Sequence, residues 1–209
     1  MDSATVSQQH KRMAGEDRRR QILQVAIELF SKRGFGGTTT KQIADAAGVS
    51  EAIIFRHFAN KQDLYAAILD FQAQEAGKDQ WIAELKEIAE EEDDEKLFRA
   101  IAGGVIKRYG TNPAFQRLIA YSALDGHEFS KILHGRALPF HAFLCDYIER
   151  RQQKGALRNL PPGLVVFALL SMPAHFGLLT KLYGFDLVKA TDEEAVSAFV
   201  QILLNGIRI

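Results

Sequence analysis

The chain has 209 residues, of which 47% are hydrophobic, so it can form one domain or two small ones around a real core. Its 26 Lys and Arg residues balance its 26 Asp and Glu residues, which excludes a strongly acidic or strongly basic protein. The lone cysteine, Cys145, excludes an internal disulfide and is typical of a reducing compartment. No apolar signal-like segment opens the chain, and we expect a cytoplasmic protein.

The charge is nevertheless distributed unevenly along the chain. Residues 1–61 contain ten Lys and Arg against six Asp and Glu, whereas residues 62–209 contain sixteen against twenty. The basic excess therefore lies in the N-terminal third. This asymmetry favours a polyanionic partner at that end.

The first 15 residues lack helical periodicity and are predicted to form a flexible tail. Basic residues from Lys11 to Arg20 either follow phosphates or enter a minor groove, as basic arms do, or are simply solvated. Asp17 is predicted to cap a first helix over residues 18–32, whose apolar residues recur at helical spacing. Gly34 is expected to end this helix.

Residues 38–61 read as two short helices joined by a tight turn. Thr39 or Thr40 can cap the first helix, whose small apolar face lets another helix approach closely. Gly48 provides the permissive backbone that ends this helix, and Ser50 can cap the second, over residues 51–58. The pattern predicts a helix-turn-helix unit, whose second helix can enter the major groove of B-DNA.

The second helix of this unit is expected to have one buried and one outward face. Ile54 and Phe58 should point inward, with Phe55 and His57 at the flanks. The outward positions are then Glu51, Ala52, Ile53 and Arg56. Asn60 can cap the following helix and place Lys61 near its positive end, where a phosphate is favoured.

At these residues the sequence resembles the TetR family of bacterial transcriptional regulators, with close similarity over about residues 18–69. The shared pattern is Thr39-Thr40, Ile43-Ala44, Ala47-Gly48-Val49-Ser50, Phe55, His57-Phe58 and Lys61. The resemblance implies base contacts from Lys41, Glu51, Ala52 and Ile53, and backbone contacts from Thr40, Phe55, His57 and Lys61. With Arg56, which contacts phosphate or solvent, and the capping Ser50, these form the predicted DNA-binding set.

Two positions depart from the family's pattern. Phe55 stands where the family usually has Tyr, so the hydroxyl that would reach a phosphate is absent. Ala52 stands where Gly is common and presents a methyl group that can touch a thymine. Both departures concern operator choice rather than the fold.

Beyond residue 62 the chain reads as helices throughout. A fourth helix runs toward residue 76, and further spans are expected at 96–109, 113–125, 129–154, 161–183 and 192–207. We therefore predict an all-α protein with a flexible tail (1–15), a DNA-binding domain (16–62) and an effector-binding and dimerisation domain (63–209). The fourth helix is expected to join the head rigidly to the bundle.

Residues 164–182 form the most apolar stretch of the chain. Ser171, Pro173 and His175 interrupt it, so we expect a buried helix and no membrane partner. The last helix is also apolar over a wide face. The resemblance implies that about 161–183 and 192–207 pair with a second copy as a four-helix homodimer interface.

The bundle interior is the expected place for a small-molecule effector. Aromatic walls with a few polar groups suit a largely apolar or aromatic ligand, although any one of these residues can equally be ordinary core. The predicted ligand-binding residues are Phe98, Phe115, Tyr121, Phe140, Phe143, Phe167, Met172, His175 and Phe176.

Other sequence features give little support to further chemistry. The acidic run over residues 90–95 is predicted to be a solvated loop or helix end. His127, His134 and His141 lie seven residues apart, too far along one helix to share a metal, so no metal or cofactor is expected. No catalytic motif is present, and Cys145 is expected to be a buried small residue rather than a nucleophile.

The sequence therefore predicts a DNA-binding regulator, most simply a repressor that a small effector releases from a palindromic operator. One alternative keeps the DNA-binding head but uses the bundle to dock a protein partner. The other is a helical enzyme without a recognisable motif.

Overall fold

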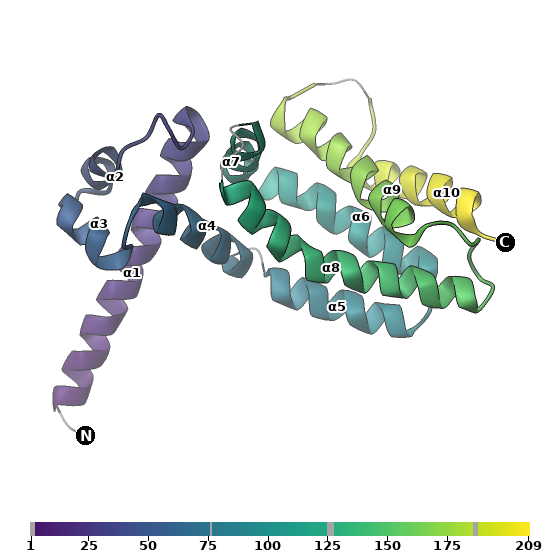
Figure 1. The fold of residues 1–209 in the computed structure, drawn as a ribbon, viewed down its shortest axis with the longest axis horizontal. Helices are drawn as coiled ribbons and strands as arrows, with labels where there is room; N and C mark the ends of the chain where they lie inside the picture. Colours follow the sequence, from purple (N-terminus) through teal and green to yellow (C-terminus); the bar gives the residue numbers. More distant parts are fainter. Residues whose placement is uncertain (1–2, 76, 125–127, 186–187) are drawn as a thin grey trace. The chain divides into compact units, whose positions relative to one another are not determined.

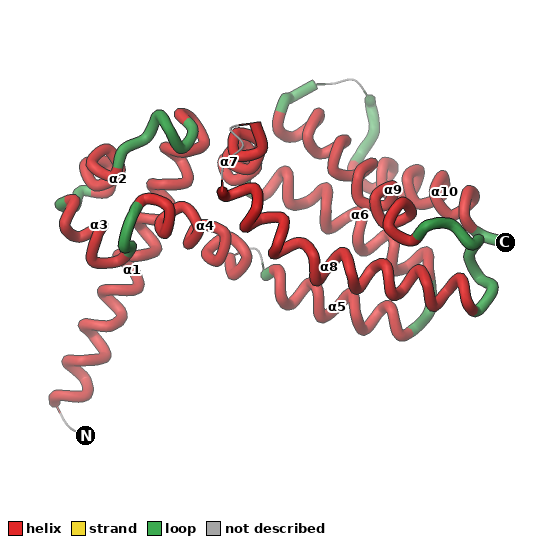
Figure 2. Tube along the Cα trace, in the orientation of Figure 1, coloured by secondary structure: helices red, strands yellow, loops and turns green. Residues whose placement is uncertain are grey.

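A computed structural model describes residues 3–75, 77–124, 128–185 and 188–209, and every regular element in these ranges is a helix (Figure 2). The prediction of an all-α protein is therefore confirmed. The elements are α1 (Ser3–Arg33), α2 (Thr40–Ala47), α3 (Glu51–His57), α4 (Lys61–Glu75), α5 (Lys78–Glu90), α6 (Asp94–Thr111), α7 (Pro113–Leu124), α8 (Glu128–Gln153), α9 (Pro162–Gly177), the π-helix η1 (Leu178–Leu182) and α10 (Asp192–Ile207).

The chain divides into two compact units. The first comprises Met1–Glu75 and Arg117–Ile132, and the second comprises Ala76–Gln116 and Leu133–Ile209. Helix α4 thus belongs with the N-terminal helices, whereas the sequence assigned residues from 63 onward to the second domain. Its buried Leu64, Tyr65 and Ile68 explain this grouping, because α4 packs against α1.

The core of the first unit is built on α1, which packs against both α2 and α4 (Figure 1). Ile22, Ala26 and Phe30 have no exposed surface. The Phe30 ring meets that of Tyr65 edge-on, with centroids 4.8 Å apart. This small core holds α2 and α3 in place.

Helix α1 begins far earlier than the sequence predicted. Its backbone is helical from Ser3, so Asp17 lies inside the helix and does not cap it. Residues 3–14 contain no Pro or Gly and include Ala, Gln, Lys, Arg and Met, which have favourable helix propensities. The predicted flexible tail is therefore replaced by helix from residue 3 onward.

The second unit is organised around α6, against which α5, α9 and α10 pack (Figure 1). Leu97, Phe98 and Ile101 of α6 are almost wholly buried. A capping box between Thr191 and Glu194 fixes the start of α10. The predicted helical bundle is thus present.

The segment Pro162–Leu182 is long and apolar enough to cross a membrane by length and composition alone, with a mean hydropathy of 1.7 over its most apolar window. One face of it, including Val166, Leu169 and Phe176, is buried in the core of the second unit. The sequence predicted a single α-helix to residue 183. The last turn is instead a π-helix, in which the Tyr183 amide donates to the Leu178 carbonyl at 3.0 Å.

The acidic run lies at helix ends, as the prediction of a solvated loop or helix end allows, but one of its residues is buried. Its residues end α5 and begin α6, but Asp94 is 6% exposed. The Asp94 carboxylate accepts hydrogen bonds from Tyr147 Oη at 2.7 Å and from Arg151 Nε at 2.9 Å. Buried carboxylates require such partners, and these come from α8, too far along the sequence for the local charge pattern to indicate them.

Candidate nucleic-acid interface

The turn between α2 and α3 has the geometry that the sequence predicted. Thr39 caps α2, accepting from the Gln42 amide at 3.1 Å, while the Gln42 side chain accepts from the Thr39 amide at 3.0 Å. Gly48 ends the helix with φ 66°, a left-handed conformation that favours glycine. The Val49 amide then donates to the Ala44 carbonyl at 3.0 Å. Local hydrogen bonds therefore fix the angle at which α3 leaves α2.

Helix α3 presents one face to the core and another outward. Ile54 and Phe58 are 1% and 3% exposed, respectively, which confirms their inward prediction. Ser50 occupies the capping position, but its side chain makes no capping hydrogen bond. The Ser50 hydroxyl is therefore not used as the sequence predicted.

The outward face of α2 and α3 contains most of the predicted DNA-binding residues. Lys41, Ala52 and Arg56 are exposed, and the Phe55 ring is 47% exposed. Ile53 and Glu51 are half-buried. The exposed apolar side chains of Ala52 and Phe55 thus lie between two exposed cations, Lys41 on α2 and Arg56 near the end of α3.

Two predicted DNA contacts are bonded to each other in this structure. The Thr40 hydroxyl donates to the Glu51 carboxylate at 2.5 Å, which ties the first turn of α2 to the first turn of α3. Any contact of either residue with DNA must compete with this bond.

Lys61, which the sequence predicted to contact the DNA backbone, makes contacts within the protein. Its ammonium group donates to the Phe35 carbonyl and lies 4.0 Å from the centroid of the Phe35 ring. Burial lowers the pKa of this lysine. Asn60 does cap α4 as predicted, accepting from the Asp63 amide at 2.8 Å. Lys61 therefore anchors the loop after α1 as well as lying at the start of α4.

Arg19 is a structural residue that sequence reasoning missed. Its guanidinium donates to the His57 carbonyl at 3.0 Å and lies 4.4 Å from the centroid of the Phe58 ring. Arg20 pairs with Glu75 at 2.8 Å. The sequence predicts either a basic arm or solvated charge for these arginines, and no local signal distinguishes a cation that packs from one that is free.

His57 contains the one buried side-chain nitrogen or oxygen, among the described residues, that has no hydrogen-bond partner, its Nε2. Burial lowers the pKa of His57, and the positive charges of Arg56, Arg19 and Arg18 lower it further. At neutral pH the imidazole is therefore uncharged. A phosphate bound beside this imidazole would supply a negative charge and would raise this pKa.

Operator affinity is consequently expected to rise as the pH falls from 8 to 6. A group whose pKa is higher in the complex than in the free protein takes up a proton on binding, so its contribution is lost as the pH rises through the pKa of the complex. Fluorescence anisotropy with labelled operator, repeated across this range, measures the effect. The His57→Gln variant, which cannot be protonated, should show a flatter profile; equal slopes would contradict a contact between His57 and phosphate.

The predicted ligand-binding residues do not line one cavity. Phe98 is 1% exposed and belongs to the packed core, whereas Phe167 is 66% exposed and His175 is also on the surface. Phe115, Phe140, Phe143 and Met172 are half-buried, and Tyr121 is exposed within the first unit. Residue type alone therefore does not predict whether an aromatic side chain lies in the core, on the surface or in a pocket.

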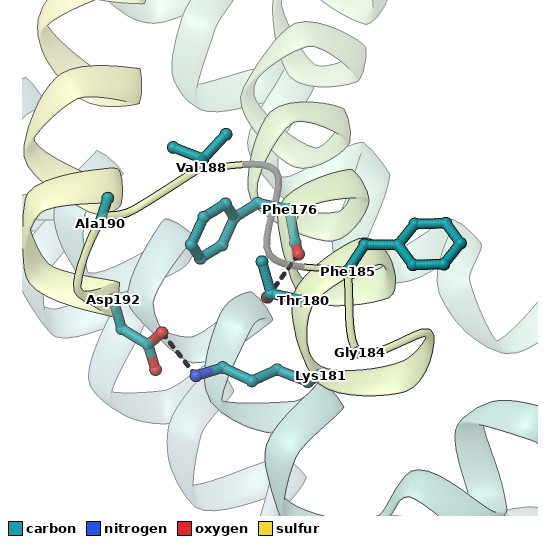
Figure 3. Close-up of a pocket in the computed structure, with 8 residues that line it drawn as sticks. All are labelled: Phe176, Thr180, Lys181, Gly184, Phe185, Val188, Ala190 and Asp192. Carbon is teal, nitrogen blue, oxygen red and sulfur yellow. Dashed lines mark hydrogen bonds and ion pairs between the residues drawn. The ribbon is translucent and has the colours of Figure 1, made fainter.

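Two of the pockets formed by described residues of the second unit each contain one residue of the predicted set. Phe176 lines a pocket of about 190 Å³ beside the Lys181–Asp192 ion pair, whose atoms are 2.8 Å apart (Figure 3). Phe143 lines the other, of about 390 Å³, with Lys86, Glu90, Asp146 and Arg150. Small-molecule sites usually measure roughly 300–1,000 Å³, so only the second reaches that range.

The histidine series does not form a metal site among the described residues, which contain no group of three or more His, Cys, Asp or Glu side chains able to hold an ion. His127 lies outside those residues. His141 Nδ1 is 3.5 Å from the sulfur of Cys145, which is half-buried. Burial raises the pKa of this thiol, with smaller contributions from Glu149 and Asp146, so a reactive thiolate is not favoured.

The geometry of α1 to α4 defines the chain as a helix-turn-helix protein. Residues 22–68 match the family described as "Bacterial regulatory proteins, tetR family". With the relatives described next, this match identifies residues 22–68 as a DNA-binding domain similar to that of TetR-family regulators.

Among similar proteins, the HTH-type regulator YvkB of Bacillus subtilis is 48% identical over 58 residues, which cover 28% of this chain and 31% of that protein. The match to YvkB thus spans less than a third of its length. The repressor NicS of Pseudomonas putida is 30% identical over 141 residues, 66% of this chain and 65% of NicS. AibR, solved with isovaleryl coenzyme A and operator DNA, superposes with a TM-score of 0.68 at 23% identity, over 90% of this chain and 98% of that one.

Proposed function

We propose that this protein is a homodimeric transcriptional repressor that binds a palindromic operator and is released by a small, largely apolar or aromatic effector. The observation that carries the proposal is the outward face of α2 and α3, where Lys41, Ala52, Phe55 and Arg56 are exposed on a motif whose other face is buried. A second helix held in this way enters the major groove, and two copies read two half-sites. A DNA partner also supports the proposal of a cytoplasmic protein.

Homodimerisation is supported by apolar surface on the last helices. Leu164 and Phe167 on α9 and Ile202 on α10 are each more than 60% exposed. A second copy would remove this surface from water. Release then requires that the effector bind one separation of the two DNA-binding units better than the other, because equal affinity would shift nothing.

The Lys41→Ala variant tests the DNA-binding face. Lys41 is exposed in the first turn of α2, so its loss should weaken binding to all operators nearly uniformly and flatten the slope of log affinity against log salt by about one unit. Lys32→Ala, an exposed lysine on α1 outside the motif, is the matched control and should leave the slope unchanged. The same slope for Lys41→Ala and the wild type would contradict this placement of DNA.

A second candidate function keeps the DNA-binding unit but uses the bundle to dock a protein partner. The observation that favours it is the pair of neighbouring rings of Tyr183 and Phe185, whose centroids are 5.6 Å apart and which are about half exposed. Pull-down of a defined partner that is lost in Phe185→Ser, with effector binding intact, would favour this function.

A further inference from the structure

Two cations in the second unit have no hydrogen-bond acceptor or ion-pair partner among the described residues. Lys78, the first residue of α5, and Arg108, near the end of α6, are both half-buried. Among the described residues, none accepts a hydrogen bond from either side chain or forms an ion pair with it. Burial lowers the pKa of both, and Arg108 and Arg136 lower that of Lys78 further against the opposite effect of Asp79. Partly desolvated cations without an acceptor favour an incoming anion.

The Arg108 side chain is held in position by an aromatic ring. Its guanidinium carbon lies 3.8 Å from the centroid of the Trp81 ring. Trp81 in turn lies against Gly104, where an added Cβ would come within 2.6 Å of the indole. The Trp81 ring covers one side of the guanidinium, whose N–H donors make no hydrogen bond to any described residue and can bind carboxylate or phosphate.

An aromatic row leads away from these cations. The ring centroids of Trp81 and Phe140 are 5.4 Å apart, and those of Phe140 and Phe143 are 6.3 Å apart. All three side chains are half-buried and pack against the core, and the contact between Trp81 and Phe140 joins α5 to α8. Phe143 also lines the pocket of about 390 Å³. The row thus provides an apolar path between the two cations and that pocket.

We propose that the effector is an amphiphilic anion, whose carboxylate or phosphate binds Arg108 and Lys78 while its apolar body lies along Trp81, Phe140 and Phe143. This inference rests on the proposed function and narrows the class of effector. A neutral ligand of the same shape would leave both cations without an acceptor, and a cationic ligand would be repelled.

Trp81 is the only tryptophan of the chain, so its fluorescence reports directly on this site. The probes are decanoate, decyl phosphate and decanol, each titrated below its micelle-forming concentration into the full-length protein. Both anions should change the emission saturably and bind at least about tenfold more tightly than decanol, as expected for charge-assisted hydrogen bonds. The tighter of the two anions identifies the head group as carboxylate or phosphate.

Two charge-removing variants and one control complete the test. Arg108→Gln and Lys78→Gln should each weaken anion binding by about tenfold and leave decanol binding unchanged. Lys107→Gln, the exposed neighbour of Arg108 on α6, should bind both anions as the wild type does. Equal affinities for decanol and the anions, or unchanged anion binding in both variants, would overturn the proposal.

Operator binding is measured separately, by anisotropy, with and without the tighter anion. Anion binding without operator binding contradicts the proposed function alone. Operator binding without anion binding contradicts this inference alone, because Lys78 and Arg108 lie outside the helix-turn-helix motif.

Discussion

Replacing Arg151 with alanine is expected to lower the free energy of unfolding of the second unit by about 3–5 kcal/mol, the usual cost of leaving a buried charge without its partner. The Arg151 side chain is 14% exposed and that of Asp94 is 6% exposed. Arg151 contacts both oxygens of the Asp94 carboxylate, at 2.9 and 3.2 Å, and also pairs with Glu92 at 3.0 Å. Its removal would leave Asp94 with the Tyr147 hydroxyl as its remaining side-chain partner. Urea denaturation followed by far-UV circular dichroism measures the change.

A matched control is provided by the adjacent Arg150. Its side chain is 52% exposed and lies 4.0 Å from Glu90, so Arg150→Ala should change stability by less than about 1 kcal/mol. Similar losses in the two variants would show that the Asp94 network does not stabilise the unit. The double variant Arg151→Met with Asp94→Leu, which removes both charges, should recover part of the loss.

Replacing Phe167 with glutamate is expected to convert the proposed dimer into a monomer. The ring is 66% exposed in the single chain, and Leu164, one turn earlier on α9, is 67% exposed. Burying a phenylalanine side chain contributes about 1.5–3 kcal/mol, and a charge in its place at a two-fold interface is introduced twice. Light scattering should report half the mass of the wild type. Operator affinity should fall by at least about 100-fold, because the second half-site no longer gains from linkage to the first.

Leu138→Glu is the control for that experiment. Leu138 is 51% exposed on α8, so this variant also introduces a glutamate at an exposed apolar position, but outside α9 and α10. It should leave both the mass and the operator affinity unchanged. A wild-type mass in Phe167→Glu would exclude α9 as the dimer interface.

The helix-turn-helix unit could be predicted from the sequence because its determinants are local. Thr39 and Gln42 cap α2 from three residues apart, and Gly48 fixes the turn through its own backbone conformation. Ile54 lies on the inward face of α3, and Phe58 directly follows the last residue of that helix; both are buried. Each of these features acts within a few residues, so a pattern in the sequence is sufficient to find it.

The contacts that the sequence did not indicate join residues far apart in the chain. Arg19 reaches the carbonyl of His57, 38 residues away, and Arg151 reaches Asp94, 57 residues away. A lone arginine looks the same in a sequence whether it packs, pairs or faces solvent. The start of α1 differs from the prediction for another reason. Residues 3–14 lack apolar periodicity, on which the prediction depends, but many of them are good helix formers.

The effector-binding residues were the least predictable part. Phe98 and Phe167 have the same side chain on apolar helices, yet one is fully buried and the other is largely exposed. The features that favour an anion are Lys78 and Arg108, which are not among the predicted ligand-binding residues. That neither has an acceptor among the described residues becomes visible only in three dimensions.

In the proposed mechanism, two copies of the protein each place α3 in a major groove of one operator. The most direct test is selection of bound duplexes from a random DNA pool, using the purified full-length protein at a stated salt concentration. The account predicts a palindromic consensus whose half-sites are about 34–36 Å apart, one helical turn, or a multiple of this spacing. Enrichment no greater than that of non-specific binding would contradict it.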